Sequence, residues 1–100
     1  MEDAPQLKGA DRSKLRGLAM RRGDDATLGK GGLAGGFVSN VDDLLKREQL
    51  VKVRLLVGER AERARLLDEL AARVGAEVVG STGKTGLLYR RNPEMASLLR

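Results

Sequence analysis

This 100-residue sequence contains neither cysteine nor histidine, and it has only two aromatic residues, Phe37 and Tyr89. Without cysteine and histidine, the chain cannot form disulfides, thiol nucleophiles, Cys/His zinc sites, Ser-His-Asp triads or imidazole acid/base pairs. Most familiar enzyme designs are therefore excluded, and we expect no catalytic residues, no metal and no cofactor. Two aromatic side chains are also too few for a sheet that stacks several bases on a row of rings.

Long apolar runs are missing as well. The longest uncharged run, residues 31–41, is rich in glycine, and it is far shorter than the roughly 20 apolar residues that a membrane span requires. Residues 1–6 do not combine a basic start with a following apolar stretch, as a signal or transit peptide would. We therefore expect a soluble, cytoplasmic protein with no membrane partner.

The residues that are present suffice for one folded domain. Hydrophobic residues make up 41% of the chain, and a domain of this size buries roughly two thirds of the surface of its unfolded chain. We see no internal repeat. The sequence predicts a single domain over residues 1–100, with an ordered core over about residues 7–91.

Hydrophobic spacing predicts helices and strands in alternation. Leu15, Leu18 and Ala19 mark one stripe of an amphipathic helix, whereas Val51, Val53, Leu55 and Val57 alternate with charged residues as in a strand. The resulting prediction is three helices over residues 10–22, 36–47 and 59–74, and four strands over residues 26–28, 50–57, 77–81 and 85–90.

This element order predicts an α/β fold. Strands that alternate with helices pair in parallel through crossovers, and the closing hairpin adds an antiparallel neighbour. We therefore expect a two-layer domain with a four-stranded mixed sheet and helices mainly on one face. The opposite face would then be open to a partner.

The first candidate site is the loop Gly29-Lys30-Gly31-Gly32, between a short strand and a helix. A GxxG loop in this position lets a phosphate approach the backbone, while Lys30 and the start of the helix supply positive potential. KH modules clamp the backbone of a nucleic acid in this way. The alternative is an ordinary flexible turn, because glycine suits turn geometry equally well.

The second candidate is the basic surface. The chain has 19 Lys and Arg against 14 Asp and Glu, a net charge of +5, and residues 8–30 hold seven cations against three anions. A strand face with Lys52 and Arg54, extended by Lys84 and Arg90, could neutralise phosphates, or it could be ordinary solvated charge. The first helix would add Arg12, Lys14, Arg16, Arg21 and Arg22.

Two further patterns favour simple structural interpretations. The segment 80–85, GSTGKT, lacks the first glycine of a phosphate-binding P-loop and precedes a strand rather than a helix, so we interpret it as a hairpin turn. The adjacent carboxylates Asp24/Asp25 and Asp42/Asp43 point in different directions on a helix or strand, which is typical of solvated charge. Tyr89, in an apolar strand, is expected to pack in the core or at the sheet edge.

Taken in order, these residues resemble the CRM domain family (chloroplast RNA splicing and ribosome maturation), in particular its stand-alone bacterial members of the YhbY type. The resemblance runs from about Leu7 to Arg91. It is carried by Leu15-Arg16 and Leu18, by the loop with the following Leu33, by residues 48–54 (EQLVKVR), by Gly75-Ala76, by Gly83-Lys84-Thr85 and by Leu88-Tyr89-Arg90.

The resemblance implies a fold similar to the carboxy-terminal domain of translation initiation factor three. It also implies a non-catalytic protein that binds RNA through the GxxG loop and the neighbouring basic surface. The implied partner is ribosomal RNA or a precursor of the large ribosomal subunit, and the implied role is ribosome assembly, with no small-molecule substrate. The alternative is a protein-interaction module that docks on a ribosomal protein, or on a second copy, through its open sheet face and Leu56.

Two positions depart from the family pattern. Ala34 stands where the family usually has Thr or Ser, so we expect the helix after the loop to lack a side-chain cap. Asp25 stands where an apolar strand residue is common, so we expect the first strand to be short.

Overall fold

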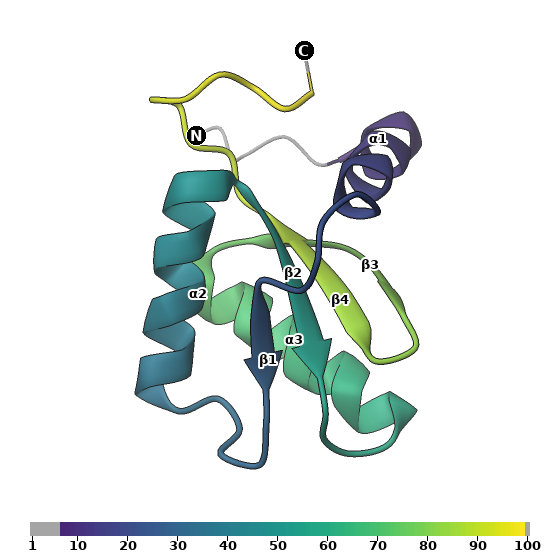
Figure 1. Cartoon of the computed structure of the whole chain (residues 1–100), viewed down its shortest axis with the longest axis vertical. Coiled ribbons are helices and arrows are strands. Elements are labelled where there is room, and N and C mark those ends of the chain that lie inside the picture. The colour runs from purple at the N-terminus through teal and green to yellow at the C-terminus, as the bar shows by residue number, and fades with distance from the viewer. Residues whose placement is uncertain (1–6, 100) are drawn as a thin grey trace.

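The computed structural model describes residues 7–99 and shows the predicted alternation of helices and strands (Figure 1). In chain order the elements are α1 (Gly9–Ala19), β1 (Ala26–Leu28), α2 (Gly35–Glu48), β2 (Leu50–Leu55), α3 (Arg60–Val74), β3 (Glu77–Thr82) and β4 (Thr85–Tyr89). Every predicted helix and strand is present, and most boundaries lie within one or two residues of the prediction.

The four strands form one mixed sheet in the order β1-β2-β4-β3. β1 pairs with β2 in parallel, whereas β4 pairs with both β2 and β3 antiparallel. The helix α2 makes the crossover between the parallel strands, and the turn at Gly83, with φ of +58°, closes the hairpin. The α/β class, the mixed sheet and the interpretation of segment 80–85 as a hairpin turn are thereby confirmed.

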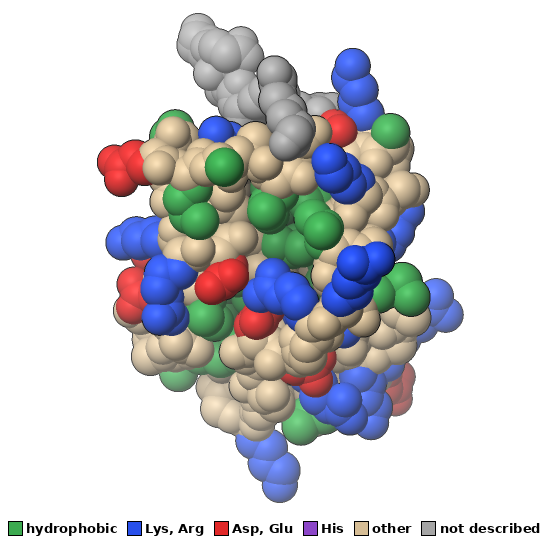
Figure 2. Space-filling model, turned by 45° about the horizontal axis from the view of Figure 1, so that its top comes forward, with side chains coloured by type: hydrophobic (Ala, Val, Ile, Leu, Met, Phe, Trp, Pro, Cys, Tyr) green, Lys and Arg blue, Asp and Glu red, His purple; other side chains and the backbone are tan. Residues whose placement is uncertain are grey.

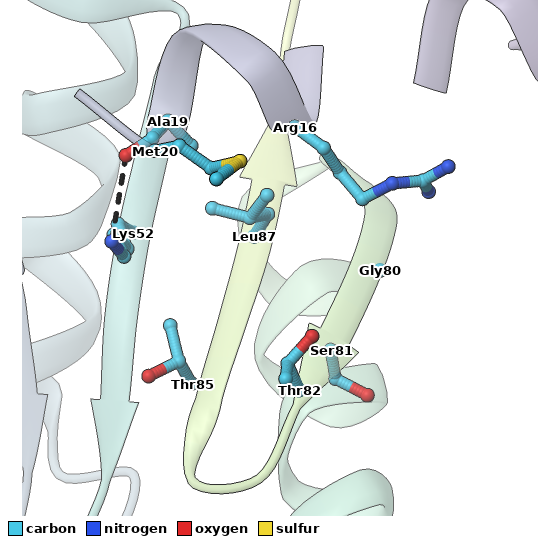
Figure 3. A pocket seen from close by; sticks show the side chains of 9 residues that line it. All are labelled: Arg16, Ala19, Met20, Lys52, Gly80, Ser81, Thr82, Thr85 and Leu87. Carbon is cyan, nitrogen blue, oxygen red and sulfur yellow. Dashed lines mark hydrogen bonds between the residues drawn. The ribbon is translucent and has the colours of Figure 1, made fainter. Parts of the chain in front are cut away.

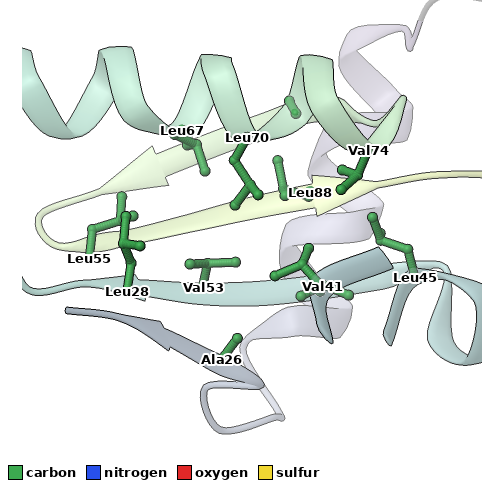
Figure 4. Packing of buried hydrophobic residues seen from close by; sticks show 12 residues of the cluster. Ala26, Leu28, Val41, Leu45, Val53, Leu55, Leu67, Leu70, Val74 and Leu88 are labelled. Carbon is green, nitrogen blue, oxygen red and sulfur yellow. The ribbon is translucent and has the colours of Figure 1, made fainter. Parts of the chain in front are cut away.

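The main core lies between one face of the sheet and the helices α2 and α3 (Figure 4). The alternation along β2 points Val51, Val53 and Leu55 to this side, as the period of two predicts. Val41 and Leu45 of α2 pack against them, because residues four apart lie on the same face of a helix. The stripe of α3 completes the cluster with Leu67, Leu70, Ala71 and Val74.

The helix α1 lies on the opposite face of the sheet. Leu15 and Ala19 form a second buried cluster with Leu50, Val79 and Leu87, joined by Tyr89. Helices are thus mainly on one face, as predicted, but the other face is less open than we expected, because α1, at the upper right in Figure 1, packs on the part of this face that holds Leu50, Val79 and Leu87. Leu18, predicted in the α1 stripe, lies at its margin with 37% of its surface exposed.

The segment after β4 is attached through Gln49, which is fully buried and has a left-handed φ of +65°. Its amide nitrogen donates to the carbonyl oxygen of Ala96 at 2.9 Å, and its amide oxygen accepts from the backbone N–H of Asn92 at 3.0 Å. Residues 91–99 are therefore held beside the end of α2. None of the helices within residues 7–99 has the length and apolar character needed to span a membrane.

Candidate nucleic-acid interface

The GxxG loop joins the end of β1 to the start of α2, as predicted. Gly32 adopts a left-handed φ of +64°, and its N–H donates to the carbonyl oxygen of Gly29 at 3.1 Å, which closes a tight turn. A Cβ atom added to Gly29, Gly31 or Gly32 would meet no described atom within 4 Å. The backbone of the loop is therefore open to an approaching group, and Lys30 is exposed beside it.

The amino terminus of α2 lies directly behind this loop. Ala34 occupies the N-cap with extended backbone and makes no side-chain cap, and the first turn, which lies wholly within the described chain, contains no acidic residue. The first N–H groups of a helix lack partners inside the helix and carry its positive partial charge. No side chain offsets this charge in the first turn, so the loop and the helix start together favour an anion.

The sheet face beside α1 carries two rows of side chains that run across the strands. The pairing aligns Thr27 of β1 with Arg54 of β2, Arg54 with Thr85 of β4, and Thr85 with Thr82 of β3. The next row holds Lys52, Leu87 and Gly80. Arg54 is therefore placed between the strand that leads into the GxxG loop and the β3-β4 hairpin.

Four of the predicted RNA-binding cations donate to backbone carbonyl oxygens of the protein. Lys52 donates from Nζ to the carbonyl oxygens of Arg22 (3.1 Å) and Ala19 (3.4 Å), so it caps the carboxyl end of α1. The Arg22 side chain donates to Asp25 and to the carbonyl oxygen of Leu50. Both cations still lie on the α1 side of the sheet.

The other two bonded cations are Arg12 and Arg90. Arg12 donates to the carbonyl oxygens of Val78 (2.6 Å) and Val79 (3.1 Å), which fixes α1 to the edge strand β3. Arg90 extends from the end of β4 toward α2 and α3, away from Lys52 and Arg54. The structure thus does not bring Arg90 together with the basic strand face.

The remaining predicted cations are exposed. Arg54 is half exposed and lies 3.7 Å from a carboxylate oxygen of Asp24. Basic side chains outnumber acidic ones on the face shown in Figure 2, but acidic side chains lie among them, so the positive charge is spread out rather than concentrated in one block. The exposed set comprises Lys14, Arg16, Arg21, Lys30, Arg54 and Lys84.

The two positions that depart from the family pattern have clear local effects. Asp25 does not extend β1: its carboxylate accepts from the backbone N–H of Lys52 at 2.8 Å and from the Arg22 side chain at 2.9 Å. The first strand is accordingly short, as expected, with three residues. Ala34 leaves α2 without a side-chain cap, also as expected.

Two groups have shifted pKa values. The hydrogen bond from Arg90 lowers the pKa of Asp42 below 3.8, and desolvation opposes this only in part. Burial raises the pKa of Tyr89 above 10.0, in line with its predicted place in the core, where it is 6% exposed. Neither group is part of the loop or of the strand rows.

A cavity that was not predicted from the sequence lies between α1 and the β3-β4 hairpin (Figure 3). It has a volume of about 490 Å³. Two of its lining residues, Arg16 and Lys52, were predicted to bind phosphates, but the sequence signal for a cavity was limited to Gly80 inside a predicted strand, since glycine there often marks a bulge. The lining residues are Arg16, Ala19, Met20, Lys52, Gly80, Ser81, Thr82, Thr85 and Leu87.

Comparison with known proteins shows the family of this chain. The model of the CRS1/YhbY (CRM) domain matches residues 7–90, and the chain therefore belongs to the CRS1/YhbY (CRM) domain family. The chain is 39% identical over 67 residues to a Pseudomonas aeruginosa protein named "Probable RNA-binding protein PA4753". That match covers 67% of this chain and 64% of the relative's length.

A solved structure is similar as well. The solution structure of the hypothetical protein SAV1595 from Staphylococcus aureus, described as a candidate RNA-binding protein, matches with a TM-score of 0.76 and 28% sequence identity. The match covers 87% of this chain and 91% of that one. The predicted family and fold are therefore confirmed.

Proposed function

We propose that this protein binds RNA, with the GxxG loop as the main contact to the sugar-phosphate backbone. The observation that carries the proposal is the open loop at the uncapped amino terminus of α2, next to the exposed Lys30. Backbone N–H groups at such a terminus bind phosphate oxygens, and Lys30 adds a mobile positive charge. The names of the two similar proteins support RNA as the ligand.

The basic surface beside the loop would extend the contact. Arg54 lies next to β1, which leads into the loop, and the exposed cations of α1 border the same face of the sheet. Phosphate contacts of this kind give affinity without reading sequence. In this proposal, Lys52, Arg22, Arg12 and Arg90 contribute mainly by holding the surface in place, because their nitrogens already donate within the protein.

We further propose that the RNA is ribosomal, as part of a precursor of the large subunit, and that the protein acts in ribosome assembly in the cytoplasm without catalysing a reaction. The resemblance to the bacterial YhbY-type proteins supports this role. Crosslinking in a cell extract, with the linked nucleotide and amino acid both mapped, tests it directly. Links from the loop to ribosomal precursors are expected, and links only to other RNAs would contradict the ribosomal role.

Salt dependence tests the loop itself. Each phosphate contact releases counterions, so log affinity falls linearly with log salt, and Lys30→Ala should reduce the slope by roughly 0.7 to 0.9 for one lost contact. Lys46→Ala is the matched control, because Lys46 is an exposed lysine near the other end of α2. RNA binding that does not respond to salt, or equal slopes for the two variants, would contradict the proposed contact.

The protein-docking alternative also has an observation in its favour, since Leu56, which directly follows β2, is 49% exposed. Cosedimentation with protein-free ribosomal RNA separates the two functions. An RNA-binding protein should sediment with the RNA, whereas a module that binds only protein should stay in the supernatant.

A further inference from the structure

We propose that the cavity between α1 and the β3-β4 hairpin receives an unstacked nucleobase of the bound RNA (Figure 3). This inference rests on the proposed RNA binding and adds the kind of RNA involved, a single strand with at least one base turned out of its stack. The loop and the cations account for contacts to phosphates. The cavity is built differently, and its residues suit a flat, partly apolar ring.

A bulge in β3 creates the space. The register of β3 on β4 shifts between Val78 and Gly80, so that Gly80 lies opposite Leu87. Both Val79 and Leu87 belong to the cluster under α1. The bulge therefore places Gly80, which has no side chain, on the face of the sheet that α1 packs against. The space above Leu87 remains unfilled, next to the part of this face that α1 covers.

The walls of the cavity are largely apolar. Leu87 forms the floor and Ala19 closes the end toward α1, and both are buried. Met20 is 82% exposed, and Figure 3 shows its side chain reaching over Leu87. A flexible methionine can adjust to a flat ring and makes favourable sulfur contacts with aromatic systems. The volume of about 490 Å³ is in the range of small-molecule sites.

The rim supplies polar and positive groups. Thr82 and Thr85 line the cavity with hydroxyls that can donate or accept hydrogen bonds, as the edge of a base requires. Lys52 and Arg16 lie on two sides, and no acidic residue of the described chain lines the cavity. Positive charge around an apolar hollow complements a base attached to a phosphate chain.

The position of the cavity relative to the loop also fits one continuous strand of RNA. Arg54 pairs with Thr27 of β1 on one side and with Thr85 of the cavity rim on the other. Neighbouring strands are about 4.8 Å apart, so the rim is roughly 10 Å from β1. An RNA strand held at the loop could thus pass over Arg54 and place a base above Leu87. Bases become available in this way only in single-stranded loops, bulges and ends.

The test compares two probes that carry the same phosphates. One is a twelve-nucleotide oligoadenylate and the other is an abasic deoxyribose-phosphate chain with the same number of phosphates. We expect the wild-type protein to bind oligoadenylate roughly tenfold more tightly, which corresponds to about 1.4 kcal/mol. Equal affinity for the two chains would overturn the base site while leaving phosphate binding intact, and no binding to either would overturn the proposed function and the base site together.

Two variants locate the effect. Gly80→Val should fold, because a Cβ there meets only the flexible Arg16 side chain, at 3.5 and 3.8 Å, and the added side chain would occupy the part of the cavity next to Leu87. Met20→Ala removes an exposed wall without disturbing the core. Both should reduce the preference for oligoadenylate severalfold with an unchanged salt slope, whereas the control Ala72→Val, at an exposed site on α3, should not. An undiminished preference in both variants would overturn the proposed location.

Discussion

Arg90 Nη1 lies 2.7 Å from Asp42 Oδ1, so the end of β4 is bonded to the middle of α2. The same nitrogen donates to the carbonyl oxygen of Val74 at 2.6 Å, and Nη2 donates to the carbonyl oxygen of Asp42 at 3.0 Å. One guanidinium therefore connects the last strand to both helices of the main core. Its geometry indicates a structural role for Arg90.

This contact predicts a specific response to acid. Because the folded-state pKa of Asp42 is below 3.8, the ionised pair stabilises the fold at pH values above 3.8, and the contribution is lost as the pH falls through the lowered pKa. Asp42→Asn should therefore be less stable than wild type at neutral pH, and the difference should shrink in acid. Urea unfolding over a pH series measures it. Asp43→Asn is the matched control, and equal pH profiles for the two variants would contradict the prediction.

Any side chain at Gly86 is predicted to lower the stability of the fold. An added Cβ would lie 2.5 Å from Cδ2 of Leu67, a buried residue of α3. Gly86→Ala should cost about 1 to 3 kcal/mol of unfolding free energy, as overpacked cores do. In the double variant with Leu67→Ala, the added methyl group should occupy part of the space that the shortened side chain at position 67 leaves. The double variant should therefore lose less unfolding free energy than the sum of the losses in the two single variants. Strict additivity in chemical denaturation would contradict the packing described here.

Ala34 offers a site where stability can be increased. It has the extended backbone of an N-cap and makes no capping bond, so Ala34→Ser should stabilise the fold by about 1 kcal/mol. For a domain of this size, that raises the melting temperature by about 5 °C. Calorimetry measures the shift. Ser39→Ala, at an exposed position inside α2, is a control that removes a hydroxyl away from the cap, and an unchanged melting temperature for Ala34→Ser would show that no cap forms.

The hydrogen bonds of Gln49 predict that its loss loosens residues 91–99. Gln49→Met keeps the length of the side chain but removes its bonds to Ala96 and Asn92, and a buried group left without its partner costs about 1 to 3 kcal/mol. Hydrogen exchange over residues 91–99 should become faster, with less change in the central strand β2. Glu48→Met, on the exposed neighbouring residue, is the control. Unchanged protection in Gln49→Met would show that other contacts hold this segment.

The sequence predicted the elements well because their signals are local. The alternation of Val51, Val53 and Leu55 defines β2, and Gly75 ends α3 in the predicted place with φ of +65°. The side of the sheet on which α1 lies was not predictable in the same way. The stripe with Leu15 and Ala19 shows which residues are buried, but it does not say against which face.

The site was predicted less completely. Sequence spacing identified the GxxG loop, since its glycines and Lys30 are adjacent in the chain. It could not separate exposed cations from bonded ones, because the partner of Arg90 is 48 residues away and that of Lys52 is 30 residues away. The cavity was missed for a related reason, since it depends on a one-residue shift in the pairing of two strands.

The irregular register of β3 has one more consequence, which concerns the outer edges of the sheet. An edge strand presents unpaired backbone groups to which a strand of another molecule can add, and short length or a bulge discourages this. Here β1, at one edge, has only three residues, and β3, at the other, carries the irregularity between Val78 and Gly80. The same backbone feature that hollows out the α1 face therefore also helps to keep neighbouring molecules from joining their sheets.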